Sequence, residues 1–132
     1  VSYHSGTREP FDDLLPKDAR SRLESRGIDV LTCAHALSGA ERAIDKIGGW
    51  APLNLVAETL RMFGQGSKVC VEIALMAADA GTLSGNDIIA IGGSSRGADT
   101  ALVISPANQK QMFELRVKEI ICKPGDFPQR KN

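Results

Sequence analysis

Residues 88–104 read IIAIGGSSRGADTALVI, two short apolar runs around a glycine-rich centre. The runs Ile88–Ile91 and Ala101–Ile104 are typical of neighbouring antiparallel strands. The centre, Gly92–Thr100, has two interpretations: a hairpin loop with a solvated Arg96, or an anion site. Glycines let backbone N–H groups turn toward a ligand, and Arg96 adds positive charge. Because a much shorter turn suffices to join two strands, the length of Gly92–Thr100 favours the functional interpretation.

The first part of the chain predicts a parallel sheet. Val1–Tyr3 and Ile28–Cys33 have the patterns of strands, and Pro16–Arg26 between them has helical spacing and ends at Gly27. A strand, a helix and a strand within about thirty residues have the size of a right-handed βαβ unit. We therefore expect an α/β protein with three layers, α/β/α, and a mostly parallel sheet that has an antiparallel edge.

The remaining elements follow from helical spacing and turn residues. Ser38 and Glu41 have the spacing of a capping box at a helix start. Further helices are expected from Ser38 to Ile47, from Leu53 to Phe63, from Ser67 to Ala80 and from Pro106 to Leu115, and a last strand from Val117 to Cys122.

The helix predicted from Ser67 to Ala80 is nearly all apolar, which indicates that it is mostly buried. Its polar residues Lys68, Glu72 and Asp79 lie within about 40° of one another around the helix axis. They could form a polar relay, but we interpret them as a solvated stripe.

Composition bounds the class of protein. The 132 residues fit one domain, expected at 1–124 with a flexible tail at 125–132. Sixteen basic and sixteen acidic residues leave no net charge, and aromatic residues make up only 5%, so no nucleic-acid partner is expected. No apolar run reaches membrane-spanning length, and no membrane partner is expected.

The three cysteines, Cys33, Cys70 and Cys122, lie far apart in apolar runs, which is typical of reduced core residues. We therefore expect a cytoplasmic location. No cysteine and histidine cluster has the spacing of metal ligands, so no metal is expected. A homo-oligomer is possible.

Three polar loops are expected to meet at the carboxyl ends of the predicted parallel strands, where ligands of open α/β sheets bind. The loops are His4–Arg8, Ala34–Gly39 and Gly92–Thr100. Their histidines, hydroxyls, glycines and Arg96 suit a phosphate, and Asp99 suits sugar or polyol hydroxyls. The candidate binding residues are His4, Gly6, Thr7, His35, Ser38, Gly39, Gly93, Ser94, Ser95, Arg96, Gly97, Asp99 and Thr100. No catalytic residue is identified, because no nucleophile or base partner has a recognisable spacing to His35.

Three segments together resemble a known family: Thr32–Ala43, Ala57–Glu72 and Ile91–Ala101. They are similar to the pyruvate-kinase C-terminal-domain-like family of small stand-alone proteins from archaea and some bacteria. The resemblance extends from Val1 to Pro124. It implies the fold of the regulatory C-terminal domain of pyruvate kinase without the catalytic barrel, so pyruvate kinase activity is not expected.

The resemblance also implies a ligand. Relatives have been seen with flavin mononucleotide (FMN), and the corresponding domain of pyruvate kinase binds a phosphorylated sugar. We therefore expect a phosphorylated ligand, FMN first, with Gly92–Thr100 as one wall of its site. The alternatives are a regulatory or interaction module that senses a phosphorylated metabolite, and a flavin-dependent oxidoreductase; whether the protein is an enzyme stays open.

The sequence departs from the family at its start. Relatives carry a further strand and helix, with a loop similar to Ser-Gly-Lys-Thr, and no such segment precedes Val1. We therefore expect the chain to be a fragment of a longer protein, which an intact-mass measurement of native protein tests.

Overall fold

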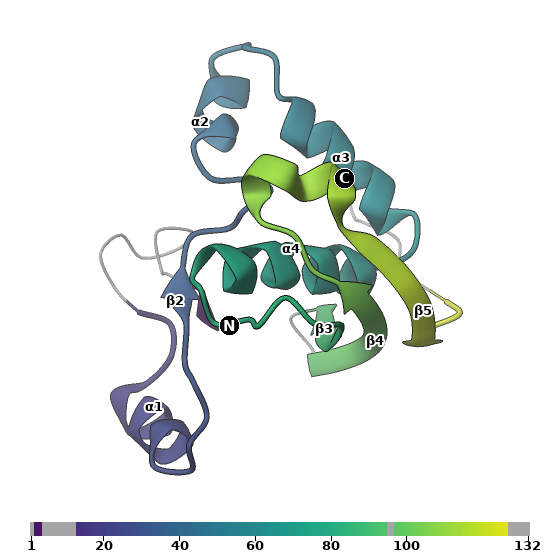
Figure 1. Cartoon of the computed structure of the whole chain (residues 1–132). Helices are drawn as coiled ribbons and strands as arrows, with labels where there is room; N and C mark the ends of the chain where they lie inside the picture. Colours follow the sequence, from purple (N-terminus) through teal and green to yellow (C-terminus); the bar gives the residue numbers. More distant parts are fainter. Residues whose placement is uncertain (1, 4–12, 95–96, 127–132) are drawn as a thin grey trace.

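The computed structural model describes residues 2–3, 13–94 and 97–126 (Figure 1). The elements are β1 (Ser2–Tyr3), α1 (Lys17–Glu24), β2 (Thr32–Cys33), α2 (Glu41–Lys46), α3 (Pro52–Arg61), α4 (Gln65–Asp79), β3 (Ile88–Ser94), β4 (Gly97–Ser105), a 3-10 helix (Gln109–Glu114) and β5 (Arg116–Cys122). The predicted helices therefore form, but the strand expected at Ile28–Cys33 is reduced to its last two residues.

The predicted mostly parallel sheet is wrong. The main sheet has three strands in the order β3-β4-β5, and both pairs are antiparallel. The parallel unit survives only as the pair β1 and β2, where Ser2 lies opposite Thr32 and Tyr3 opposite Cys33. The reason lies in the connections. A parallel pair needs a long crossover, whereas a hairpin and one short 3-10 helix join β3, β4 and β5.

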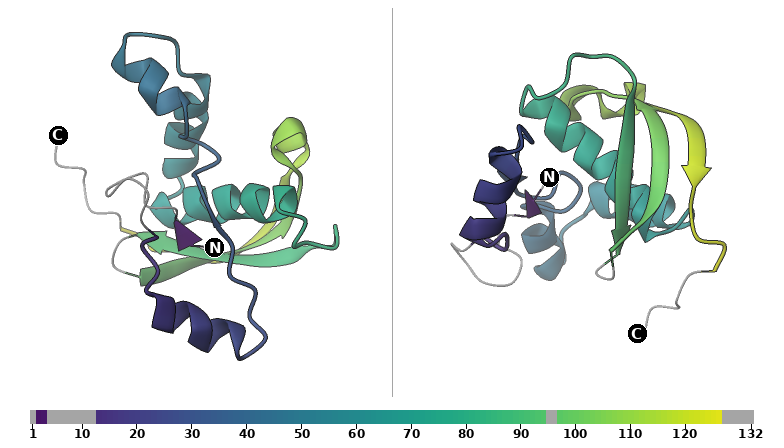
Figure 2. Two further views of the ribbon diagram at one scale, coloured as in Figure 1. Left: turned by 90° about the vertical axis from the view of Figure 1, so that its left-hand side faces the viewer. Right: turned by 90° about the horizontal axis from the view of Figure 1, so that it is seen from below.

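The expected third layer is also absent from the described part of the chain. Helix α4 covers one face of the sheet (Figure 2). On the other face, Ile89 and Ile91 are 63% and 59% exposed. The protein is therefore a small α/β domain with a three-stranded antiparallel sheet and a few helices, not the expected three-layer α/β/α sandwich similar to the C-terminal domain of pyruvate kinase.

The core lies between α4 and the sheet. Cys70, Ala74 and Leu75 of α4 pack against Leu102 and Ile104 of β4. Leu37, from the loop after β2, and Ala57, from α3, belong to the same cluster. Because α4 also meets α3, most of its residues are buried, as its apolar sequence predicted.

Glycines let α4 approach the glycine-rich end of the sheet closely. A Cβ atom on Gly92 would lie 2.9 Å from the carbonyl oxygen of Gly66. A Cβ atom on Gly66 would collide with the Thr100 hydroxyl and lie 2.6 Å from the Asp99 carboxylate. The first turn of α4 therefore fixes the start of β4.

Cysteine placement corrects one prediction. Cys70 is buried and Cys33 is half-buried, but Cys122 in β5 is exposed. Cys122 is therefore not a core residue, because β5 is an edge strand that α4 covers incompletely. Among the described residues, no helix combines the length and the apolar character needed to cross a membrane.

Candidate functional site

The glycine-rich segment is a hairpin, and the prediction of a long loop there is wrong. Strands β3 and β4 continue through it until Ser94 lies opposite Gly97. The pairing steps from Gly92 opposite Thr100 to Gly93 opposite Ala98, so Asp99 is the extra residue of a β-bulge. The backbone N–H groups that face the partner strand therefore serve the strand pairing and are not available to an anion.

Two features of the hairpin require glycine. Gly97 has a φ of +116°, which side chains rarely allow. A Cβ atom on Gly93 would collide with the Gly97 carbonyl oxygen and lie 2.8 Å from the Ala98 Cα. The geometry of the hairpin therefore explains both glycines, and no ligand is needed to account for them.

Asp99 and Thr100 face the first turn of α4. The Thr100 hydroxyl is buried and donates a hydrogen bond of 2.7 Å to the Asp99 carboxylate. Asp99 lies close to Gly66, at the amino end of the helix, where a negative charge is favourable. Since a carboxylate already lies at this helix end, a phosphate is disfavoured there.

The loop after β2 is held by a buried cluster of polar groups that we call the Glu72 cluster: His35, Lys68, Glu72 and the backbone N–H of Leu37. One carboxylate oxygen of Glu72, Oε2, accepts from His35 Nδ1 at 3.0 Å and from Lys68 Nζ. The other, Oε1, accepts from the Leu37 N–H at 3.0 Å. The cluster thereby ties the loop to the middle of the core helix.

Burial strengthens the attraction between the charges of the Glu72 cluster, because little water screens them. Lys68 is 3% and Glu72 1% exposed. Burial opposes the charge of Glu72, but the hydrogen bonds from His35 and Lys68 and the charge of Lys68 prevail and lower the pKa of Glu72 to about 2. Burial lowers the pKa of Lys68 despite its bond to Glu72, and the positive charges of Arg61 and Arg42 lower it further.

The interpretation of Lys68 and Glu72 as a solvated stripe is therefore wrong, and both belong to the candidate site. They are four residues apart on α4 and form an ion pair. One feature of the sequence indicates that these residues are buried: the helix is apolar nearly all round, so it has no broad face for solvent. Asp79 differs, since it is exposed and accepts from the Gln109 N–H at 3.1 Å.

The Glu72 cluster fixes the orientation of His35. A carboxylate can only accept hydrogen bonds, so the Nδ1 atom of His35 carries a proton in this contact. The side chain of His35 keeps 16% of its surface exposed, at the edge of the loop. This is the arrangement by which carboxylates set the tautomer of functional histidines.

A small polar pocket of about 40 Å³ adjoins the loop. Its walls include Leu37 and Ser38 of the loop, Arg42 of α2 and Arg61 of α3. Arg61 pairs with Glu58 at 2.6 Å and donates to Gln65 at 2.9 Å. Within the described part of the chain, the exposed Arg42 has no hydrogen bond or ion pair through its side chain.

Two acidic residues also line this pocket, Glu41 and Asp45. The predicted capping box of Ser38 and Glu41 is wrong, because α2 begins at Glu41 without a side-chain cap. The Glu41 carboxylate instead caps α3, accepting from the N–H groups of Leu53 at 2.9 Å and Asn54 at 2.8 Å. The connection of residues 47–51 between α2 and α3 brings the carboxylate to those donors.

The structure separates the predicted loops. His35, Ser38 and Gly39 lie in the loop held by the Glu72 cluster, and Gly93, Ser94, Gly97, Asp99 and Thr100 lie in the hairpin. Around α4, Lys68 and Glu72 are about 200° and 240° from Gly66. The loop and the hairpin therefore lie on different faces of α4 and do not converge. His4, Gly6, Thr7, Ser95 and Arg96 lie outside the described residues.

Neither spacing nor comparison assigns a cofactor. Among the residues described, no group of three or more His, Cys, Asp or Glu side chains could hold a metal ion. No protein-family model matches the chain.

Proposed function

We propose that the protein binds a phosphorylated small molecule, with FMN as the first candidate, at the pocket between the loop after β2 and helices α2 and α3. One observation carries the proposal: Arg42 and Arg61 line the same small polar pocket beside Ser38. Guanidinium groups and hydroxyls are the groups that proteins use to bind phosphate oxygens. FMN is chosen because the sequence resembles a family in which FMN has been seen.

The pocket is lined by charges of both signs, and its cations are the groups that would attract an anion. Glu58 compensates Arg61, and Glu72 compensates Lys68, while Arg42 has no partner within the described part of the chain. The positive charges of Arg61 and Arg42 act on Lys68 nearby. An anion in this pocket would therefore relieve repulsion among these cations. Two carboxylates of the lining would oppose it: Asp45, and Glu41, whose charge is partly satisfied by the N–H groups of Leu53 and Asn54.

The pocket limits what the phosphate site can hold. A volume of about 40 Å³ is too small for a whole nucleotide, so at most the phosphate end of a ligand enters the pocket. The Glu72 cluster would keep the loop in place without ligand, which reduces the ordering cost of binding. His35 and Gly39 of the same loop would then contact the part of the ligand that lies outside.

Titration of the full chain with FMN and with riboflavin, followed by flavin fluorescence, tests the proposal. FMN is expected to bind at least ten times more tightly than riboflavin, which lacks the phosphate. Arg42→Ala and Arg61→Ala should weaken FMN binding about tenfold or more, as expected for lost charged hydrogen bonds. Asp45→Asn should strengthen it. Arg22→Ala, an exposed arginine of α1, is the matched control and should change nothing.

Equal affinities for FMN and riboflavin, or equal effects of Arg42→Ala and Arg22→Ala, would exclude this pocket as a phosphate site. Binding of another phosphorylated compound with the same response to Arg42→Ala and Asp45→Asn would support the site and replace FMN as its ligand. Loss of binding at higher salt concentration is expected as well, because Arg42 is exposed.

A further inference from the structure

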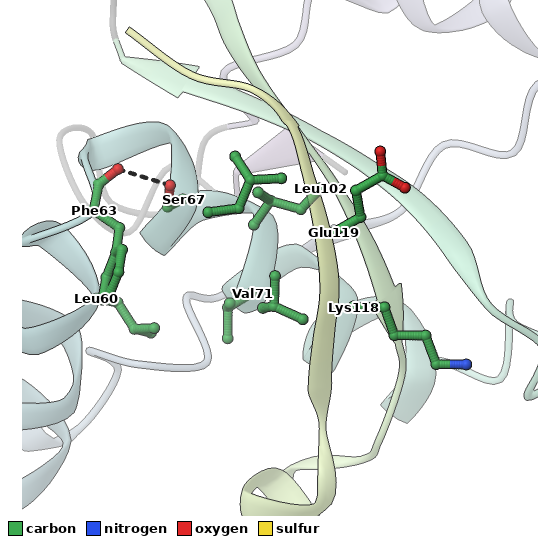
Figure 3. A pocket seen from close by; sticks show the side chains of 9 residues that line it. Leu60, Phe63, Ser67, Val71, Leu102, Lys118 and Glu119 are labelled. Carbon is green, nitrogen blue, oxygen red and sulfur yellow. Dashed lines mark hydrogen bonds between the residues drawn. The ribbon is translucent and has the colours of Figure 1, made fainter. Parts of the chain in front are cut away.

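A second hollow, apart from the polar pocket, lies beneath the edge strand β5 (Figure 3). Its volume is about 330 Å³. Six apolar residues line it. They are Leu60 of α3, Phe63 just after α3, Val71 of α4, Leu102 of β4, and Val117 and Ile120 of β5. We call this hollow the β5 cavity.

The β5 cavity is an unfilled apolar volume. Val71 and Leu102 are buried at its floor, whereas Phe63 and Ile120 are 51% and 45% exposed. The hollow therefore opens to solvent on the side of Phe63 and Ile120 and is closed by packed apolar side chains at its floor. Cavities of about 300 Å³ and above that are lined by aliphatic and aromatic side chains are typical of small-molecule sites.

Ser67, Lys118 and Glu119 complete the lining of the β5 cavity, and the charged ends of Lys118 and Glu119 lie away from its apolar walls (Figure 3). The Ser67 hydroxyl donates to the carbonyl oxygen of Phe63 at 2.9 Å. Lys118 pairs with Asp87 at 2.6 Å, and in Figure 3 the side chains of Lys118 and Glu119 point away from the apolar walls. An ionic group placed inside would lose its hydration without finding a partner. Charge complementarity therefore requires an uncharged occupant.

We propose that the β5 cavity binds an uncharged, planar aromatic ring system. An apolar cavity of about 150 Å³ is sufficient for benzene in another protein, so this larger one has room for fused rings. Phe63 provides an aromatic partner at the wall, and pairs of aromatic rings attract beyond their buried area. The apolar floor of Val71 and Leu102 contacts a ring without competing for hydrogen bonds.

The ring can come from two sources. It can belong to a ligand that also carries the phosphate and passes around α3, on which Leu60 of the cavity and Arg61 of the polar pocket point about 100° apart. In that case the inference rests on the proposed function. It can also belong to a separate aromatic molecule, and then the cavity is an independent site.

Equilibrium binding to the full chain tests the proposal with two uncharged probes, indole and lumiflavin, the flavin ring without its ribityl phosphate. Both are expected to bind saturably. Val71→Phe fills the floor of the cavity and should weaken both at least tenfold. Ile89→Phe, the same kind of change on the opposite face of the sheet, should leave binding unchanged. Thermal unfolding of each variant checks that it folds, and Ile120→Trp at the mouth replaces Val71→Phe should that variant unfold.

Failure of both probes to saturate, or equal loss in Val71→Phe and Ile89→Phe, would overturn the proposal. Competition between FMN and indole would assign the ring to the phosphorylated ligand, and simultaneous binding would assign it to a separate molecule; both outcomes support the cavity. Indole binding that survives Arg42→Ala, in a protein that does not bind FMN, would refute the proposed function alone.

Discussion

Glu72 accepts a hydrogen bond from His35 at 3.0 Å, although the two residues lie 37 positions apart in the chain. The same carboxylate oxygen accepts from Lys68, one turn earlier on α4. A buried carboxylate that accepts from an ammonium group and from an imidazole N–H is favourable only while these partners remain in place, because burial penalises an unpaired charge. The Glu72 cluster is therefore both a support of the loop after β2 and a sensitive point of the fold.

Acid should destabilise the protein through Glu72. Its pKa is about 2 in the folded state, against an ordinary value of 4.5 in the unfolded chain. Because the folded pKa is lowered, the stabilisation is complete above about pH 5 and is lost as the pH falls toward 2, which amounts to roughly 3 kcal/mol for this group. Urea unfolding at pH 6, 4 and 3 measures it. Glu72→Gln should flatten this dependence, and Asp18→Asn, in an exposed pair, should not.

Replacing one partner of the buried pair Lys68 and Glu72 should lower the free energy of unfolding more than replacing both partners. Lys68→Met leaves the Glu72 charge buried and should lower the free energy of unfolding by about 3–5 kcal/mol. The double variant Lys68→Met with Glu72→Leu leaves no such charge and should be distinctly more stable than the single one. Urea unfolding of Lys68→Met, of Glu72→Leu and of the double variant gives the coupling energy between the two residues. Additive effects would show that the ion pair contributes nothing.

Gly66→Ala should destabilise the contact between α4 and the hairpin. Its Cβ would collide with the Thr100 hydroxyl and crowd the Asp99 carboxylate. Overpacking of this kind costs about 1–3 kcal/mol. Gly125→Ala is the control, since a Cβ there has no neighbour within 4 Å. Thermal unfolding compares them, and equal melting temperatures would mean that Thr100 can move aside at no cost.

The cysteines should differ in reactivity. Cys122 is exposed and should be alkylated first in the native protein. Burial, together with the negative charge of Asp99, raises the pKa of Cys70 to about 11, and burial raises the pKa of Cys33. Since the thiolate is the reactive form, Cys33 should react slowly and Cys70 only after unfolding. Timed alkylation with iodoacetamide and mass spectrometry measures the order. Early labelling of Cys70 would contradict the buried position.

The antiparallel pairing of β3 with β4 and the buried helix α4 follow from the sequence alone, whereas the continuation of the strands to Ser94 and Gly97 does not. Short apolar runs on both sides of glycines specify adjacent antiparallel strands, and an apolar run with helical length specifies a buried helix. The loop Ala34–Gly39 stays a predicted site, based on His35 and Ser38. These features depend on residues that are close in the chain, where spacing determines geometry.

Tertiary structure decided the rest. The strand, helix and strand pattern near the start predicted a parallel sheet, but pairing partners depend on contacts across the whole chain, and only β1 and β2 pair in parallel. Lys68 and Glu72 looked like a solvated stripe, because a sequence does not show which other segments cover a helix. Only the packing of the loop after β2 and of α3 against α4 buries them, and burial turns an ordinary pair of charges into the Glu72 cluster.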